Sequence, residues 1–202
     1  MQWRAPAILA IGFTLGVALM GVQMAASRLL TPYFGSGIEV WASLISTVMF
    51  SLMAGYYIGG RVADAAPRSQ VLGVCVIVAG GFLALTPPLA TPVLDWTLDT
   101  LGDGVLATLF AAAAIMFVPM TLLSFFSPYA VRLLLADAAH GGRVAGAVYS
   151  ITTIGNIVGT LGTALYLMTI LGSRDIMLLF AGVIAACGVG LVLLRVRGDA
   201  DA

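Results

Sequence analysis

The sequence has few charged residues and no lysine. Of its 202 residues, 9% are charged and 61% are apolar, whereas about 25% of the residues in a soluble domain are charged. Nine arginines face nine acidic residues, so the formal net charge is zero and there is no basic tract for a nucleic acid. The composition therefore excludes a soluble globular domain and gives no reason to expect a nucleic-acid partner.

Residues with catalytic or metal-binding chemistry are equally scarce. Cys75 and Cys187 each lie inside an apolar run, which favours small buried side chains over a disulfide. The single histidine, His140, lies in the segment AAHGGR, which offers no further metal ligand. Because the sequence has no phosphate-binding glycine loop, H-E-x-x-H motif or Ser/His/Asp set, we expect no catalysis, metal or other cofactor in this chain.

What the sequence does have is long apolar segments. Six of them are long enough to cross a hydrocarbon core of about 30 Å, and Pro, Gly or charged residues separate them. The expected spans are residues 6–29, 38–61, 69–88, 104–127, 144–170 and 175–195. The first begins like a signal peptide but continues without a small-residue cleavage site, so we expect it to be retained. The sequence thus predicts an all-α integral membrane protein with a single six-helix membrane domain over residues 1–202.

The distribution of arginines predicts the orientation. With six spans, only Arg28 and Arg174 fall on one side of the membrane. The other side receives Arg4, Arg61, Arg68, Arg132, Arg143, Arg195 and Arg197. Because short cytoplasmic loops accumulate basic residues, we expect both termini in the cytoplasm and a bacterial-type inner-membrane location.

Similar residues end the first and fourth spans. Thr31-Pro32-Tyr33 closes one and Ser127-Pro128-Tyr129 closes the other. This recurrence fits three spans followed by three inverted spans, an arrangement found in transporters. Chance recurrence of common helix-end residues is the alternative.

A polar stripe runs along the fifth expected span. Its members are Tyr149, Thr153, Asn156, Thr160 and Thr163, and the first four are candidate ligand-binding residues. Beside it lie three small residues that suit close helix packing, Gly155, Gly159 and Gly162. We therefore expect this helix to be central, with its stripe either facing a ligand or bonded to its own carbonyl groups and to neighbouring helices.

Two other spans carry related features. Gly55 and Gly59 form a small-residue face on the second span, which we expect to pack closely against another helix. Gln23 places an amide in the middle of the first span, where polar groups are functional candidates. An interhelical hydrogen bond with no further role is the other interpretation of Gln23.

Arg28 and Glu39 flank the turn between the first two spans. An ion pair between them would hold the hairpin, and both are candidate ligand-binding residues. Alternatively, Arg28 reaches into the lipid headgroups and Glu39 stabilises the start of the second helix.

The segment Gly60-Arg61-Val62-Ala63-Asp64, followed by Arg68, resembles the signature loop of the major facilitator superfamily. The resemblance implies a conformational latch made by Gly60, Asp64 and Arg68, in which glycine lets two helices approach and the charged pair joins their ends. An ordinary charged loop at the cytoplasmic side is the alternative.

A longer resemblance covers most of the chain. Four segments are similar to the membrane section of fused facilitator/spermidine-synthase-like proteins: VQMAASRLLTPYFGSGIEVW, GYYIGGRVAD, SPYAVRLLL and GRVAGAVYSITTIGNIVGTLGTALYLMTILGSR. In those relatives a soluble aminopropyltransferase-like domain follows, which we expect to be absent from this chain. The relatives usually have Glu where Gln23 stands and an apolar or aromatic residue where Glu39 stands, so a proton-coupling role does not carry over.

The resemblance and the polar stripes together predict a half-facilitator-like bundle that transports or binds a small polar metabolite, such as a polyamine or a related cation. A lone half implies a homodimer or a partner membrane chain. The alternative is a membrane anchor or scaffold for a separately encoded, soluble spermidine-synthase-like enzyme; an intramembrane enzyme is a weaker third interpretation. Transport predicts that the stripe of the fifth span lines a water-accessible cavity, whereas scaffolding predicts that neighbouring helices fill that space.

Overall fold

The computed structural model describes residues 4–135 and 140–198, and the protein is 91% helical. In these residues no strand is present, and six helical segments are long and apolar enough to cross a membrane. The elements are α1 (Arg4–Phe34), α2 (Ile38–Ala65), α3 (Ser69–Leu101), α4 (Val105–Ser124), α5 (Phe126–Leu134), α6 (Gly141–Gly162), η2 (Thr163–Leu167), α7 (Met168–Ile170) and α8 (Ser173–Leu194). The prediction of an all-α protein with six helices able to span a membrane is confirmed.

Two of the six segments are interrupted helices. Between α4 and α5 the helix breaks at Phe125, and Pro128 explains the break because its ring nitrogen has no proton to donate to the Ser124 carbonyl group. The fifth segment passes from α6 through η2, a π-helical turn, into α7. Single π-turns inside α-helices occur frequently at functional sites.

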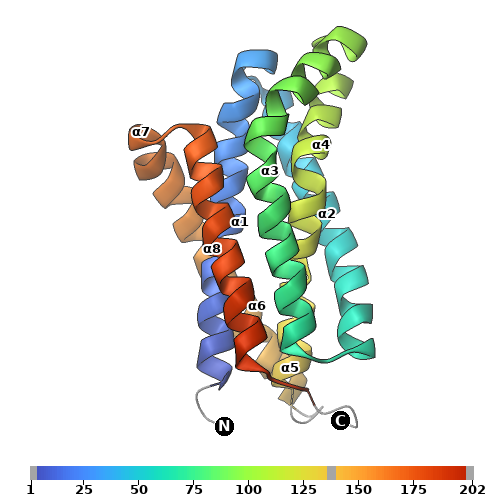
Figure 1. Ribbon diagram of the computed structural model, residues 1–202, viewed down its shortest axis with the longest axis vertical. Coiled ribbons are helices and arrows are strands. Elements are labelled where there is room, and N and C mark those ends of the chain that lie inside the picture. The colour runs from blue at the N-terminus through green and yellow to red at the C-terminus, as the bar shows by residue number, and fades with distance from the viewer. Residues whose placement is uncertain (1–3, 136–139, 199–202) are drawn as a thin grey trace.

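The helices lie side by side along the length of the molecule (Figure 1). The main pairings are α3 with α8 and α4, α1 with α6 and α8, and α2 with α4. The segment α6–η2–α7 contacts chiefly α1, and in α6 only Val148, Gly155 and Gly159 are buried. The expected central position of this helix is therefore wrong: its glycine surface is narrow and accommodates a single neighbouring helix.

Glycines set the closest helix contacts. An added Cβ at Gly155 would collide with the carbonyl oxygen of Phe13, and one at Gly159 with that of Val17, both on α1. At Gly162 it would meet nothing within 4 Å. The expected strip of three packing glycines on this helix therefore contains only two, because Gly162 lies on a flank that faces away from α1.

On α2, Gly55 lies against the carbonyl oxygen of Thr121, and an added Cβ at Gly59 would be 2.8 Å from the Cα of Phe125. A further close contact, not predicted from the sequence, joins α3 and α8. There Gly73 of α3 and Gly188 of α8 face each other. A Cβ on either would lie 2.7–2.8 Å from the carbonyl oxygen of the other. This reciprocal contact accounts for the close approach of α3 and α8.

Helix α3 continues past the predicted end of the third span at residue 88. It contains Pro87, Pro88 and Pro92 and ends only at Leu101. Proline is tolerated in membrane helices where neighbouring helices and threonine hydroxyl groups compensate for the lost backbone bonds. The α3–α4 hairpin consequently rises above the other helices at one end of the bundle (Figure 1), and Trp96 packs against Phe110 there with ring centroids 5.8 Å apart.

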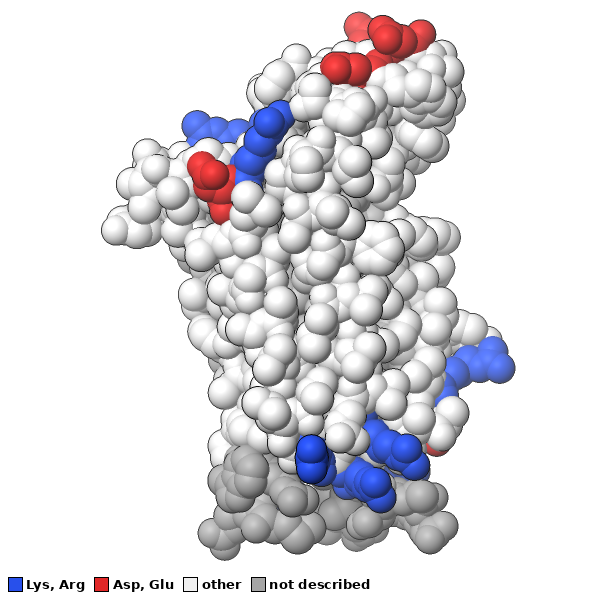
Figure 2. Space-filling model, in the orientation of Figure 1, with Lys and Arg blue, Asp and Glu red and all other residues white. Residues whose placement is uncertain are grey.

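Helix α1 begins, and α8 ends, at the opposite end of the bundle (Figure 1). Arginine side chains gather at that end, acidic side chains are prominent at the other, and the middle of the face shown in Figure 2 carries no charged residue. This uncharged belt fits a bilayer environment.

Candidate functional site

A small polar cavity lies among α1, α2, α4, α5 and α6. Its volume is about 60 Å³, which leaves room for a few water molecules. Its polar lining residues are Tyr56, Ser124, Ser127, Thr152 and Asn156, and no charged residue lines it. The cavity can therefore hydrogen-bond a solute but offers no counter-charge.

Two glycines of α1 create the cavity. An added Cβ at Gly12 would lie 2.7 Å from the ring of Phe126, and one at Gly16 would lie 3.1 Å from Oδ1 of Asn156. Any larger residue at these positions would displace α6 or fill the space beside Asn156. On α1, glycine therefore leaves space for the cavity, in addition to the close helix packing expected from the sequence.

The hydroxyl groups of the cavity are largely engaged within the protein. Ser124 donates to the carbonyl oxygen of Met120 at 2.6 Å, and Thr152 donates to that of Val148 at 2.9 Å. Tyr56 and Ser127 also direct hydroxyl-bearing side chains at the cavity. Ser124 and Thr152 therefore already donate their hydroxyl protons, and each can offer a solute only its oxygen as an acceptor.

Asn156 differs from these residues. Its side chain makes no hydrogen bond to any residue in the described ranges 4–135 and 140–198. An amide supplies two donor hydrogens and an acceptor oxygen. Asn156 is therefore the residue of the predicted polar stripe that is best placed to bind a solute.

The rest of the stripe lies along the open flank of α6. Tyr149 and Thr153 are exposed, and Thr160 donates its hydroxyl proton to the backbone carbonyl oxygen of Asn156 at 2.8 Å. Thr160 thus matches the alternative interpretation, in which a threonine bonds to its own helix. Thr152, which is not a member of the predicted stripe, lines the cavity.

Gln23 does not share this cavity. It is only 6% exposed and lies on α1 about two turns beyond Gly16, the residue that faces Asn156. The two amides that sequence analysis selected as ligand-binding candidates are therefore placed in different parts of the bundle.

The predicted pairing of Arg28 with Glu39 is absent. Arg28 donates from Nη1 to the carbonyl oxygen of Met168, near the end of the fifth span. Glu39 is exposed in the first turn of α2, where a carboxylate interacts favourably with the helix dipole. Arg28 binds Met168 because a helix end leaves backbone carbonyl groups without partners.

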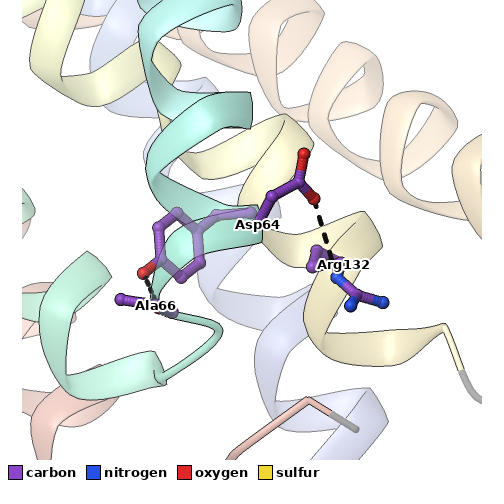
Figure 3. Close-up of polar contacts among 4 residues, drawn as sticks. Asp64, Ala66 and Arg132 are labelled. Carbon is purple, nitrogen blue, oxygen red and sulfur yellow. Dashed lines mark hydrogen bonds and ion pairs between the residues drawn. The ribbon is translucent and has the colours of Figure 1, made fainter. Parts of the chain in front are cut away.

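In the predicted latch, Asp64 pairs with Arg132 and not with Arg68. Asp64 pairs with Arg132 on α5 (Figure 3), with 3.7 Å between its Oδ1 and Nε of the arginine, and this is the only ion pair whose two members both lie in the described residues. Arg68 occupies the N-cap position of α3, where its side chain makes no capping hydrogen bond, and it does not pair with Asp64. The Asp64 side chain is 77% exposed, so the pair contributes about 0–1 kcal/mol.

Two neighbouring contacts join the same helix ends. Tyr129 donates its hydroxyl proton to the carbonyl oxygen of Ala66, the other contact drawn in Figure 3. The glycine that makes the close approach is Gly59, whereas a Cβ at Gly60 would have only Pro128 nearby, at 3.9 Å. Tyr129 and Arg132 belong to the segment SPYAVRLLL and Asp64 to the segment GYYIGGRVAD. The sequence therefore contained a signal for all three residues, but not for the contact between the two segments.

The turn η2 contains the last residue of the predicted polar stripe, Thr163, whose hydroxyl group is buried. Thr163 is 1% exposed, and its Oγ1 has no hydrogen-bond partner. It lies next to Gly21 of α1, where an added Cβ would be 2.8 Å from that oxygen. The polar stripe of α6 therefore ends at an unpaired hydroxyl group buried against α1.

Within the described residues, no group of three His, Cys, Asp or Glu side chains is arranged to hold a metal ion. No protein-family model, curated protein or solved structure matches this chain.

Proposed function

We propose that this chain is one six-helix half of a transporter-type membrane protein that binds a small polar metabolite in the cavity beside Asn156. The Asn156 amide is the observation that carries the proposal, because it lines the cavity and has no hydrogen-bond partner in the described residues. An amide without partners is costly in an apolar environment unless a ligand or water satisfies it. Intramembrane polar groups of this kind are functional candidates.

The lining favours an uncharged polar metabolite over a polyamine. No carboxylate lines the cavity, and Glu39 is exposed at the start of α2. Taking an ammonium group out of water is expensive unless an opposite charge is paired with it. A polyamine or related cation is therefore retained as one member of the ligand panel used in the test.

We further propose that a second copy of the chain completes the site. The cavity of one copy is too small for a metabolite, and its two flanks are open: Tyr149 and Thr153 are exposed on α6, and Met49 and Met53 on α2. Contact with a second polar stripe would satisfy groups that lipid leaves unpaired. A homodimer would place two such cavities face to face; a different membrane chain is the alternative partner.

The resemblance to the membrane section of fused facilitator/spermidine-synthase-like proteins supports the same proposal. The arginine-rich end of the bundle supports an orientation with both termini in the cytoplasm of a bacterial-type inner membrane (Figure 2). A scaffold for a soluble synthase-like enzyme would require neither an open flank nor a free amide, so these two features favour binding and transport over scaffolding.

The test is ligand-induced thermal stabilisation of the purified protein across uncharged polar metabolites, amino acids, polyamines and organic anions. Asn156→Leu should abolish stabilisation by the ligand that binds the wild type, because it removes the only unpaired amide of the cavity. Ser150→Ala is the matched control, since Ser150 lies on the same helix, is exposed, does not line the cavity and is not part of the polar stripe. The control should respond as the wild type does.

Flux of the same ligand into liposomes then separates transport from binding. If no compound of the panel stabilises the wild type, or if Asn156→Leu responds like the wild type, the proposed site is wrong and scaffolding becomes the better account.

A further inference from the structure

Two arginines lie directly opposite each other at the end of the bundle where α8 ends. Arg68 and Arg197 form an isolated antiparallel β-bridge between the α2–α3 connection and the segment after α8. Side chains that are directly opposite in such a pair point to the same face, and like charges in this arrangement repel. Both arginines line an open pocket, together with Ala65, Ala66, Pro67 and Gly198.

The backbone holds the two arginines in place. Ser69 donates its N–H to the carbonyl oxygen of Val196 at 2.9 Å, and Gly198 donates to that of Pro67 at 2.9 Å. The Val196 N–H in turn donates to Oγ of Ser69 at 2.8 Å. Three hydrogen bonds therefore fix the bridge, so the arginines cannot separate without breaking it.

No carboxylate in the described residues neutralises this pair. The acidic residue nearest to Arg68 in sequence, Asp64, is paired with Arg132, and neither Arg68 nor Arg197 has an ion-pair partner among the described residues. Arg68 is also the N-cap of α3, a helix of 33 residues, whose dipole places further positive charge at the pocket. The pocket thus combines two guanidinium groups with the positive end of a long helix.

We propose that this pocket binds a phosphate group, either as the headgroup of an anionic phospholipid or as a soluble phosphate. Arginine guanidinium groups match the geometry of phosphate oxygens and bind them through paired hydrogen bonds. Helix N-termini bind the same group. The pocket lies at one end of the membrane-spanning bundle, and basic pockets at this level in membrane proteins bind anionic headgroups. The site is separate from the cavity beside Asn156 and does not depend on the function proposed for it.

The experiment measures the thermal stability of the full chain in a neutral detergent. Three titrations are compared: phosphatidylglycerol, phosphatidylcholine and inorganic phosphate. Phosphatidylglycerol should raise the melting temperature and phosphatidylcholine should not, because its headgroup carries no net negative charge. A rise with inorganic phosphate as well would identify the phosphate group itself as the ligand, whereas a rise with phosphatidylglycerol alone would identify the lipid.

Arg68→Gln and Arg197→Gln should each weaken the apparent affinity for phosphatidylglycerol about tenfold, since each removes a charged hydrogen-bond donor. Arg197→Lys should weaken it less, because it keeps the charge but loses the paired donors. Arg61→Gln is the matched control: it removes the same charge from the last turns of α2, where Arg61 contacts Tyr57 and does not line the pocket. The control should bind like the wild type.

A variant in which Asp199 and Asp201 are both replaced by Asn removes the carboxylates that follow Gly198 in the sequence, and it should bind phosphatidylglycerol at least as well as the wild type. Equal responses to the two lipids would overturn the proposal. So would equal losses in Arg61→Gln and Arg68→Gln, because they would indicate general attraction to a basic surface, and so would a response that is lost in the Asn double variant.

Discussion

Replacing Gly159 by leucine should destabilise the protein far more than the same replacement at Gly182. A Cβ at Gly159 would collide with the carbonyl oxygen of Val17 and lie 2.8 Å from its Cα, whereas at Gly182 nothing lies within 4 Å. Because the obstructing atoms belong to the backbone of α1, no rotamer change can relieve the collision, and α6 must move away from the one helix that it chiefly contacts.

The magnitude follows from two opposing effects. Overpacking costs about 1–3 kcal/mol, and leucine gains up to about 1 kcal/mol over glycine in helix propensity. At Gly182 only the gain applies, so the two variants should differ by about 1–3 kcal/mol in free energy of unfolding. For a chain of this length that difference corresponds to roughly 2–12 °C in melting temperature.

The assay is thermal unfolding in detergent of Gly159→Leu, Gly159→Ala, Gly162→Leu and Gly182→Leu. Gly159→Ala should already be destabilised, since its single methyl group meets the same carbonyl oxygen. Gly162→Leu should behave like Gly182→Leu, because an added Cβ there meets no atom within 4 Å. Equal melting temperatures for Gly159→Leu and Gly182→Leu would refute the packing of α6 on α1, and a large loss at Gly162 would restore the three-glycine strip expected from the sequence.

Three further predictions concern the charged residues and the topology. A double-mutant cycle on Asp64→Asn and Arg132→Gln should give a coupling free energy below about 1 kcal/mol, because the pair is exposed on the Asp64 side; a coupling of several kcal/mol would identify a strong latch. Arg28→Gln should lower the free energy of unfolding by about 0.5–1.5 kcal/mol through loss of its exposed bond to the backbone, and its effect should add to that of Glu39→Gln. Non-additivity in denaturation experiments would indicate the ion pair that the structure lacks. Ala202→Cys, made in a background without the native cysteines, should be labelled by a membrane-impermeant thiol reagent only after cell lysis; labelling of intact cells would place the C-terminus outside.

The lengths of the apolar segments predict the number of helices well, because each span must satisfy its own backbone in lipid. The same reasoning placed the end of the third span too early, at the prolines near residue 88. Those prolines lie within α3, where Pro87 is buried and Thr86 donates its hydroxyl proton to the carbonyl oxygen of Phe82. Whether a proline ends a helix depends on its neighbours in space, and a local sequence window does not contain them.

The candidate site was only partly predictable for a similar reason. The spacing along α6 correctly grouped Asn156 with its polar neighbours on one face, since helical periodicity is a local property. It did not predict that Tyr56 and Ser127 would share the cavity, or that Arg132 rather than Arg68 would face Asp64. These pairings depend on which helices pack together, and one sequence without tertiary information does not determine that.

The unequal lengths of α3 and α8 have a consequence for the lipid around the protein. Arg174, in the first turn of α8, donates to the hydroxyl group of Thr91 at 2.7 Å, yet α3 continues for ten more residues to Leu101, or about 15 Å at the helical rise. With 33 residues, α3 is about 50 Å long and exceeds the full bilayer with its headgroups, whereas α8, with 22, is about 33 Å long and little more than matches the hydrocarbon core. The surface of the protein is therefore stepped at this end. Lipid headgroups can lie above α8, beside the wall of the α3–α4 hairpin, with Arg174 at the base of the step.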